Sequence, residues 1–238
     1  MTNKRTLTDW IVATRPWSYP ASTMPVALVL AYYFANGVAI DPVNAVWALL
    51  NIIIFHAAGN VWSDYFDFRY GVDNQNTLGV RQLVDGKFTA REFIWFATFL
   101  FAVGTLCALF LVWRTGLPFL AVTFAGIAAA LVYPPLKYRV GGDVVIFIAY
   151  TLTPLFATAW IVTGTWSLDA IWAVLPTGIL TSAFCTPITC ATLRRILRPA
   201  FVRSLRSWGK SGRCGFISLR CSRRLQFFWQ RSGLEFCR

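Results

Sequence analysis

Charged side chains are scarce along this chain. Of its 238 residues, 13% are Asp, Glu, Lys or Arg, whereas 57% are hydrophobic and 16% are aromatic. A soluble domain carries about a quarter charged residues, so this composition excludes an ordinary soluble fold. Several apolar runs approach the ~20 residues that a helix needs to cross a bilayer. The sequence therefore predicts a membrane protein with several spanning helices.

Two further absences narrow the class of protein. The N-terminal segment has no small-residue cleavage pattern, and it stays polar and basic for too long to be a cleavable signal peptide. The six cysteines follow no zinc-binding spacing, and four of them fall after residue 185. We therefore expect neither a cleaved signal peptide nor a zinc site.

Acidic residues almost disappear near the C-terminus. Residues 1–185 contain ten Lys or Arg and nine Asp or Glu, whereas residues 186–238 contain twelve Lys or Arg and the single acid Glu235. The net charge of +12 therefore belongs mainly to the last segment. The chain divides into an apolar part, residues 1–185, and a basic, Cys- and Arg-rich tail, residues 186–238.

The apolar part predicts an all-α fold, a polytopic bundle of about six spanning helices. The loops on the N-terminal side carry nine basic residues, and those on the opposite side carry one, Arg114. The positive-inside rule then predicts a cytoplasmic N-terminus in the inner, cytoplasmic membrane. The predicted spans are Tyr19–Ala35, Val43–Trp62 continuing toward Phe68, Phe93–Trp113, Leu117–Tyr133, Asp143–Val162 and Ile171–Cys185.

A polar cluster ends the second apolar run. At ~100° per residue, Asn60, Asp64 and Asp67 fall within about 60° of one another on one helix face. A carboxylate at membrane depth costs about 2.5 to 3.5 kcal/mol, so it rarely lacks a partner. Mg²⁺ prefers carboxylate oxygens and shares its shell with phosphates, so the cluster favours a cytoplasm-facing site for Mg²⁺ and a diphosphate. Another acid and three basic residues follow: Asp73, Arg81, Lys87 and Arg91.

Alternatives remain open for these residues. In one, the polar side chains simply cap a helix end in water; we favour the metal and diphosphate site. The only histidine, His56, precedes Asn60 by four residues and shares its helix face. For His56 we favour an interior, hydrogen-bonded residue over a metal ligand.

Four segments resemble a known family of membrane enzymes. Ala13–Leu28 (ATRPWSYPASTMPVAL) resembles the opening of the UbiA-type intramembrane prenyltransferases, and Gly59–Asp73 (GNVWSDYFDFRYGVD) resembles their first aspartate-rich motif. Thr77–Phe93 and Tyr133–Asp143 are similar to the loops that follow. The version of the motif is similar to that of the 1,4-dihydroxy-2-naphthoate polyprenyltransferases of menaquinone biosynthesis. The resemblance covers about residues 8–185.

The resemblance implies a helical bundle of nine helices, of which six are retained here. Its central cavity would bind a polyprenyl diphosphate and an aromatic acceptor within the lipid bilayer, with no nucleic acid as partner. Mg²⁺ would be the cofactor, with Asp64 and Asp67 as ligands. Asn60 would replace the Asn that the family has where this chain has Ser63. The remaining substrate-binding residues would be Asp73, Arg81, Lys137 and Arg139.

In such an enzyme, an aromatic ring carbon attacks the allylic cation left by the departing diphosphate. The resemblance makes Tyr133 and Asp143 candidates for positioning the acceptor or taking its proton. Other acceptors stay open, namely 4-hydroxybenzoate, a haem precursor or a chlorophyllide. A non-catalytic membrane remnant, or a transporter-like protein that couples ions through Asp64 and Asp67, is the alternative from another class.

The second aspartate-rich motif of the family, NNxRDxxxDxxxGxxT, is missing. Residues 186–206 stand in its place and contain no Asp or Glu. Codon degeneracy allows the same segment, read one nucleotide back, to encode HANNMRDVTTDSASGIRTFATVMGK, which has the motif. We therefore expect a frameshift near codons 185–186 and an inactive or poorly folded polypeptide. A genuine basic tail that binds anionic lipids is the rival interpretation, and nucleic-acid binding by the tail is less favoured.

Overall fold

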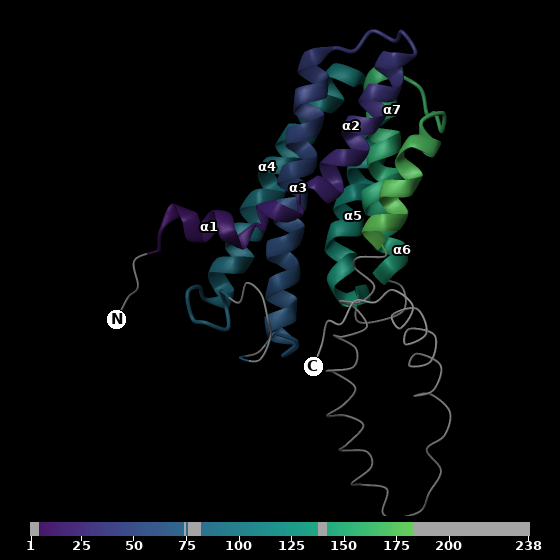
Figure 1. The fold of residues 1–238 in the computed structure, drawn as a ribbon. Helices are drawn as coiled ribbons and strands as arrows, with labels where there is room; N and C mark the ends of the chain where they lie inside the picture. The colour runs from purple at the N-terminus through teal and green to yellow at the C-terminus, as the bar shows by residue number, and fades with distance from the viewer. Residues whose placement is uncertain (1–4, 74, 76–81, 138–141, 183–238) are drawn as a thin grey trace, which may run out of the picture. The chain divides into compact units, whose positions relative to one another are not determined.

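The computed structural model describes residues 5–73, 75, 82–137 and 142–182, which belong to one compact unit. These ranges contain helices and no strand (Figure 1). The all-α prediction is therefore confirmed for this part of the chain. In chain order the elements are α1 (Leu7–Ala13), η1 (Pro16–Ser18), α2 (Pro20–Ala35), α3 (Pro42–Arg69), α4 (Ala90–Thr115), α5 (Phe119–Lys137), α6 (Gly142–Phe147), η2 (Ile148–Leu152), α7 (Thr153–Thr163) and a further helix, Ile171–Ser182.

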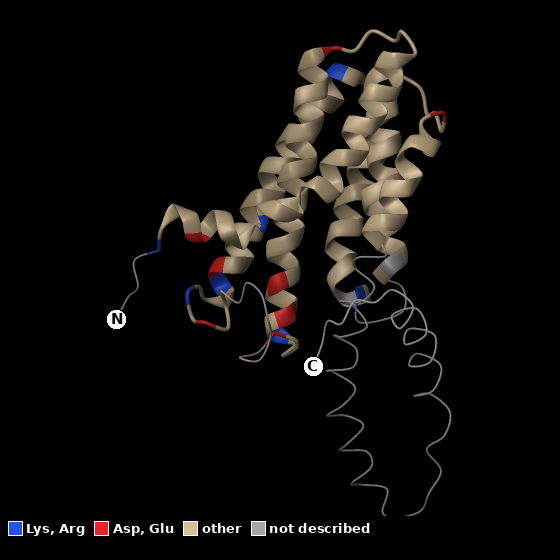
Figure 2. Ribbon diagram, in the orientation of Figure 1, with Lys and Arg blue, Asp and Glu red and all other residues tan. Residues whose placement is uncertain are grey.

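Each of the six predicted spans corresponds to an apolar helix or a continuous series of helical segments. Three are long and apolar enough to cross a membrane, namely Pro42–Arg69, Ala90–Thr115 and Val144–Thr163. Three more are apolar but shorter: Pro20–Ala35, Phe119–Pro134 and Ile171–Ser182. Charged residues gather near the two ends of the long helices, and their middles are free of them (Figure 2). This distribution is that of a multi-pass membrane protein.

The longest helix, α3, begins at a well-formed cap. Asp41 Oδ1 accepts from the backbone N–H of Val43 at 2.8 Å, and Pro42 occupies the first helical turn, where its missing N–H costs nothing. Arg114, at the end of α4, pairs with Asp41 Oδ2 at 2.5 Å and donates to Asn44 Oδ1 at 2.5 Å. The start of α3 is thereby fixed to the end of α4.

A glycine lets α3 and α4 approach closely. A Cβ on Gly104 of α4 would lie 3.3 Å from the side chains of Ile54 and Phe55 on α3. The same approach brings Asn51 Nδ2 to 2.8 Å from the Gly104 carbonyl oxygen, which adds a hydrogen bond between the helices. Small residues allow such contacts between membrane helices, where close packing rather than the hydrophobic effect holds helices together.

The short helix α1 docks against the start of α4. The Trp10 ring packs edge-on to Phe88 and Phe96, with centroids 4.5 and 4.7 Å away. Asp9 caps α1 together with Thr6 and also pairs with Lys87 Nζ at 3.0 Å. The chain that follows α1 is thereby held near the end of α3 that carries Asp64 and Asp67.

Acid should loosen this docking of α1. The hydrogen bond from the Thr6 backbone, then that from Lys87, lowers the pKa of Asp9 from 3.8 to about 2. The folded pKa is depressed, so the stabilisation is complete above the ordinary pKa and is lost as the pH falls toward 2. We expect protection of the α1 amides to fall over that interval in hydrogen exchange. Asp9→Asn should lower protection at neutral pH and remove its dependence on acid, and an acid-sensitive Asp9→Asn chain would contradict this.

The fifth predicted span is one continuous helical stretch with a wider turn inside it. Between α6 and α7 the five residues of η2 form a π-helix. Such turns insert an extra residue, are rare, and occur often at functional sites. Ala149 and Tyr150 from η2 line a cavity, as do Thr153 and Pro154 from α7.

Candidate diphosphate and metal site

An apolar cavity of about 420 Å³ lies among α2, α3, α5, α6, η2 and α7. Most of its wall is hydrophobic, which suits an isoprenoid or other lipid chain. Representative apolar residues in the wall are Val26, Ile52, Leu111, Phe119, Ile146 and Ile161. The polar residues described below meet at the end of the cavity near the C-terminus of α3.

Lys137 pairs with Asp67 at this polar end. Its Nζ lies 2.5 Å from Asp67 Oδ2 and 2.6 Å from Ser63 Oγ, so the last residue of α5 is tied to α3. Both Asp67 and Lys137 line the cavity, and each side chain is 12% exposed. The carboxylate predicted to bind metal and the cation predicted to bind diphosphate are therefore in direct contact.

Arg15 pairs with the second carboxylate. Its Nη2 lies 2.5 Å from Asp64 Oδ1, and the Asp64 side chain is 8% exposed. Arg15 is the only non-glycine residue with positive φ (53°) in the described ranges, and it directly precedes Pro16. Such a conformation costs on the order of 1–3 kcal/mol and persists only where its surroundings enforce it. Here it turns the guanidinium toward Asp64.

Asn60 connects α3 to the segment between α1 and α2. Its Nδ2 donates to the Thr14 carbonyl oxygen at 2.9 Å and to Ser18 Oγ at 3.0 Å. Ser18 is also 3.1 Å from His56 Nε2, while Ser22 Oγ is 2.7 Å from His56 Nδ1. The prediction that His56 is an interior, hydrogen-bonded residue is confirmed. Asn60 also lines the cavity, and its predicted role as a metal ligand stays a prediction.

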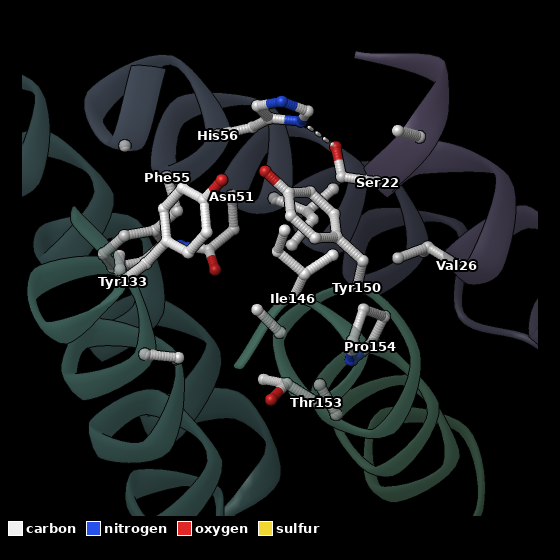
Figure 3. Close-up of a pocket in the computed structure, with 18 of the residues that line it drawn as sticks. Ser22, Val26, Asn51, Phe55, His56, Tyr133, Ile146, Tyr150, Thr153 and Pro154 are labelled. Atoms are coloured by element: carbon white, nitrogen blue, oxygen red, sulfur yellow. Dashed lines mark hydrogen bonds between the residues drawn. The ribbon is translucent and has the colours of Figure 1, made fainter. Parts of the chain in front are cut away.

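Two tyrosines face the cavity from opposite walls. Figure 3 shows Tyr133 of α5 near Phe55 and Asn51, and Tyr150 of η2 near His56 and Ser22. The Tyr133 ring lies 5.8 Å from Lys137 Nζ, within range of a cation–π contact. Tyr133 thus lies in the cavity wall beside Lys137, and its predicted role in positioning the acceptor stays a prediction.

The other predicted site residues lie around or beyond this region. Asp73 follows α3, and its backbone N–H donates to the Asp67 carbonyl oxygen at 3.2 Å. Asp143 belongs to α6, but its side chain lies outside the described part. Arg81 and Arg139 also lie outside the described residues, as does the whole tail, residues 186–238. Their predicted roles stay predictions.

The residues present fit part of a magnesium site. Asp64 and Asp67 offer carboxylate oxygens, the ligands that Mg²⁺ prefers. Asp64 Oδ1 is buried, and it pairs with the Arg15 guanidinium without forming a hydrogen bond of good geometry. A metal cation bound at this oxygen would replace that pair. Within the described ranges no group of three or more Asp, Glu, His or Cys could hold a metal by itself, so phosphate oxygens and water would complete the shell.

Sequence reasoning missed the partner of Asp64. Arg15 was counted only among the basic residues of the N-terminal side, because nothing in its spacing links it to a residue 49 positions later. The one available signal was its place directly before Pro16, which restricts the backbone of the preceding residue. Ser18 and Ser22 were likewise unremarkable without the position of His56.

The comparisons with known proteins agree with this architecture of apolar helices around a cavity with a polar end. The profile of the UbiA prenyltransferase family matches residues 23–192. The chain therefore belongs to the UbiA prenyltransferase family.

Similar curated proteins are named UbiA prenyltransferase domain-containing protein 1. The one from Gallus gallus is 34% identical over 181 residues, which cover 73% of this chain and 54% of the relative. The one from Xenopus tropicalis is 31% identical over 187 residues (76% and 54%), and the one from Homo sapiens is 30% identical over 182 residues (74% and 53%). The chain spans about half the length of these relatives.

Proposed function

We propose that this chain derives from an enzyme that transfers a prenyl group from a polyprenyl diphosphate to an aromatic acceptor. The observation that carries the proposal is that Arg15, Asp67 and Lys137 line the polar end of an apolar cavity, where Lys137 pairs with Asp67 and Arg15 pairs with the buried Asp64, which is not itself a lining residue. A diphosphate head with a long hydrocarbon tail matches both parts of this cavity. Membership of the prenyltransferase family supports the same substrate class.

Arg15 and Lys137 are positioned to exchange partners when the substrate binds. Each now neutralises one carboxylate at 2.5 Å. Arg and Lys both pair well with phosphate oxygens, and Arg does so through two parallel bonds. A cation held by Asp64 and Asp67 would release the two basic side chains to the diphosphate. Arg81 and Arg139 are proposed to join them.

The chemistry follows from charge. Mg²⁺, bound by Asp64 and Asp67, would neutralise the diphosphate and make it a better leaving group. Arg15 and Lys137 stabilise the negative charge that develops as the allylic C–O bond breaks. The hydrophobic wall keeps water away from the resulting carbocation, so that a ring carbon of the acceptor captures it. Tyr133, beside Lys137, is proposed to orient that ring, and Asp143 to assist.

We infer 1,4-dihydroxy-2-naphthoate, as in menaquinone biosynthesis, as the acceptor. Support comes from the segment Gly59–Asp73, whose pattern is similar to that branch of the family. We also infer that the N-terminus and the site face the cytoplasm of an inner membrane, because the basic loops lie on that side. Competition among 1,4-dihydroxy-2-naphthoate, 4-hydroxybenzoate and a chlorophyllide distinguishes the acceptors.

Ligand protection tests the proposal without turnover. Geranylgeranyl S-thiolodiphosphate, an unreactive donor analogue, should raise the unfolding temperature of the detergent-solubilised chain in the presence of Mg²⁺. EDTA should abolish the shift, because the metal links the carboxylates to the diphosphate. Geranylgeraniol, which has the tail without the head, is the control. An equal shift with geranylgeraniol, or no shift with the analogue, would contradict a diphosphate site.

A further inference from the structure

A second polar site lies in the cavity wall, about one helical turn along α3 from Asn60. Its centre is His56, which is 7% exposed and lines the cavity. Ser18 Oγ lies 3.1 Å from Nε2, and Ser22 Oγ lies 2.7 Å from Nδ1, so both ring nitrogens are engaged. The ring of Tyr150 lies edge-on to His56, 5.1 Å away between centroids (Figure 3).

Each serine hydroxyl also has a backbone partner. Ser18 Oγ lies 2.8 Å from the Arg15 carbonyl oxygen, and Ser22 Oγ lies 3.0 Å from that of Tyr19. Ser18 Oγ accepts in addition from Asn60 Nδ2. A hydroxyl has one hydrogen to donate and two lone pairs. A serine that donates its hydrogen to the ring therefore loses its hydrogen bond to the backbone carbonyl oxygen.

The number of available hydrogens determines which protonation states of His56 this network can satisfy. A neutral imidazole has one nitrogen that needs a hydrogen from a hydroxyl, so one of the two hydroxyl–carbonyl bonds is lost. When both nitrogens carry a hydrogen, both serines accept from the ring and donate to their carbonyls. All five contacts are then made at once. The ring can therefore take up a second proton through the rotation of one hydroxyl, and no buried polar group loses its partner.

The two serines differ in burial. Both line the cavity, but Ser22 is fully buried, whereas Ser18 is half-buried. Ser22 therefore fixes the ring by accepting from Nδ1–H, and Ser18, beside Nε2, is the hydroxyl that offers exposed surface to a ligand. A hydroxyl beside a histidine whose other nitrogen is held in place is the arrangement that proton-transfer sites use.

We propose that His56 takes up the hydroxyl proton of a phenolic acceptor through Ser18 while a ring carbon of that acceptor attacks the prenyl donor. This inference rests on the proposed function. Asn60 contacts Ser18 and precedes Asp64 by one turn, so the relay lies beside the place where the diphosphate leaves. A phenolate ring is a stronger carbon nucleophile than the phenol.

The transfer balances. The acceptor O–H bond breaks and its electron pair stays on oxygen, while its proton moves to Ser18 Oγ and the Ser18 proton moves to Nε2. The C1–O bond of the donor breaks and its electron pair leaves with the diphosphate, after which the ring carbon bonds to C1 of the allylic cation. If the attacked carbon carries a carboxylate, CO₂ departs and its bonding pair restores the aromatic ring; if it carries a hydrogen, that hydrogen departs as a proton to the diphosphate and the C–H bonding pair restores the ring. In both cases the phenolate oxygen recovers its own proton from His56 through Ser18.

The chain contains a single histidine, which makes the test direct. We would bind 4-nitrophenol to the solubilised 238-residue chain at a pH at which the free probe is mostly neutral. The expected result is that bound probe absorbs as phenolate, and that ¹⁵N-histidine spectra show hydrogens on both nitrogens of His56. In His56→Gln and in Ser18→Ala the phenolate-to-phenol ratio should fall at least about tenfold, the equivalent of ~1.4 kcal/mol.

Thr123→Val is the matched control. Thr123 also lines the cavity, but its hydroxyl donates to the Phe119 carbonyl oxygen in its own helix. It should keep the phenolate signal. A neutral bound probe in the unaltered chain, a phenolate that persists in His56→Gln, or no binding of the probe would each overturn the proposal. Protection by the thiolodiphosphate together with a neutral probe would refute the role of His56 alone, whereas loss of both signals would refute the proposed function as well.

Discussion

Asp67→Asn is expected to weaken Mg²⁺-dependent binding of a prenyl thiolodiphosphate about 100-fold, which corresponds to ~2.8 kcal/mol. The amide is a poorer metal ligand than the carboxylate, so the link between α3 and the diphosphate is weakened. Loss of the ion pair with Lys137, 2.5 Å from Asp67 Oδ2 in a site that is 12% exposed, should lower the stability of the fold instead, because Lys137 exchanges Asp67 for the diphosphate in the bound state. Titration of the analogue by isothermal calorimetry measures the change.

Asp41→Asn is the matched control for this substitution. Asp41 stands at the opposite end of α3, and its Oδ2 also lies 2.5 Å from a cation, that of Arg114. Losing that pair should reduce the stability of the fold only slightly, because surface pairs contribute little. It should leave the affinity for the analogue within about twofold, because Asp41 lies at the end of α3 opposite the site. Equal loss of affinity in both variants would show that Asp67 acts through stability alone.

The second large effect concerns the tail. Membranes that contain the 238-residue chain are expected to form no detectable prenylated product from geranylgeranyl diphosphate and 1,4-dihydroxy-2-naphthoate. A chain that continues after residue 185 in the shifted reading frame should restore product by several orders of magnitude, because ligands shared between two motifs act as a unit. Radiolabelled donor and extraction of the lipid product measure this.

Replacing the aspartates of the restored motif by alanine should return activity to the background. This control separates the motif from any general gain in stability. Robust turnover by the 238-residue chain would contradict the prediction, and so would a nucleotide sequence in which no one-base shift yields the motif. A genuine basic segment would instead be supported if the tail binds anionic lipid vesicles and still binds them after the order of its residues is shuffled.

Periodicity in the sequence was enough to predict the helices and the shared face of Asp64 and Asp67. Both depend on local rules, namely the length of an apolar run and the angle between residues of one helix. The family resemblance named Lys137 as a diphosphate-binding residue, but its pairing with Asp67 was not predicted. Its contact with Ser63 explains why a hydroxyl is tolerated where the family has Asn, since Ser63 Oγ accepts from Lys137 at 2.6 Å.

What the sequence did not predict depends on backbone shape or on long-range contacts. The left-handed conformation of Arg15 brings it to Asp64, and no pattern of residue types encodes that turn in a non-glycine residue. The relay of Ser18, His56 and Ser22 requires η1, α2 and α3 to meet. The π-helix η2 was also unpredicted, because its sequence (IAYTL) is as compatible with an ordinary helix turn.

The π-helix η2 changes the rotation of α7 about the helix axis relative to α6, so the two parts of this transmembrane segment turn different faces to the cavity. Removal of a single residue from η2 would rewind it to regular geometry and rotate everything after it by about 100° relative to α6. Thr153 and Pro154 would then point away from the cavity, while Ile146, which precedes η2, would stay in the cavity wall. The lining of the cavity beyond α6 therefore depends on one surplus amino acid in η2.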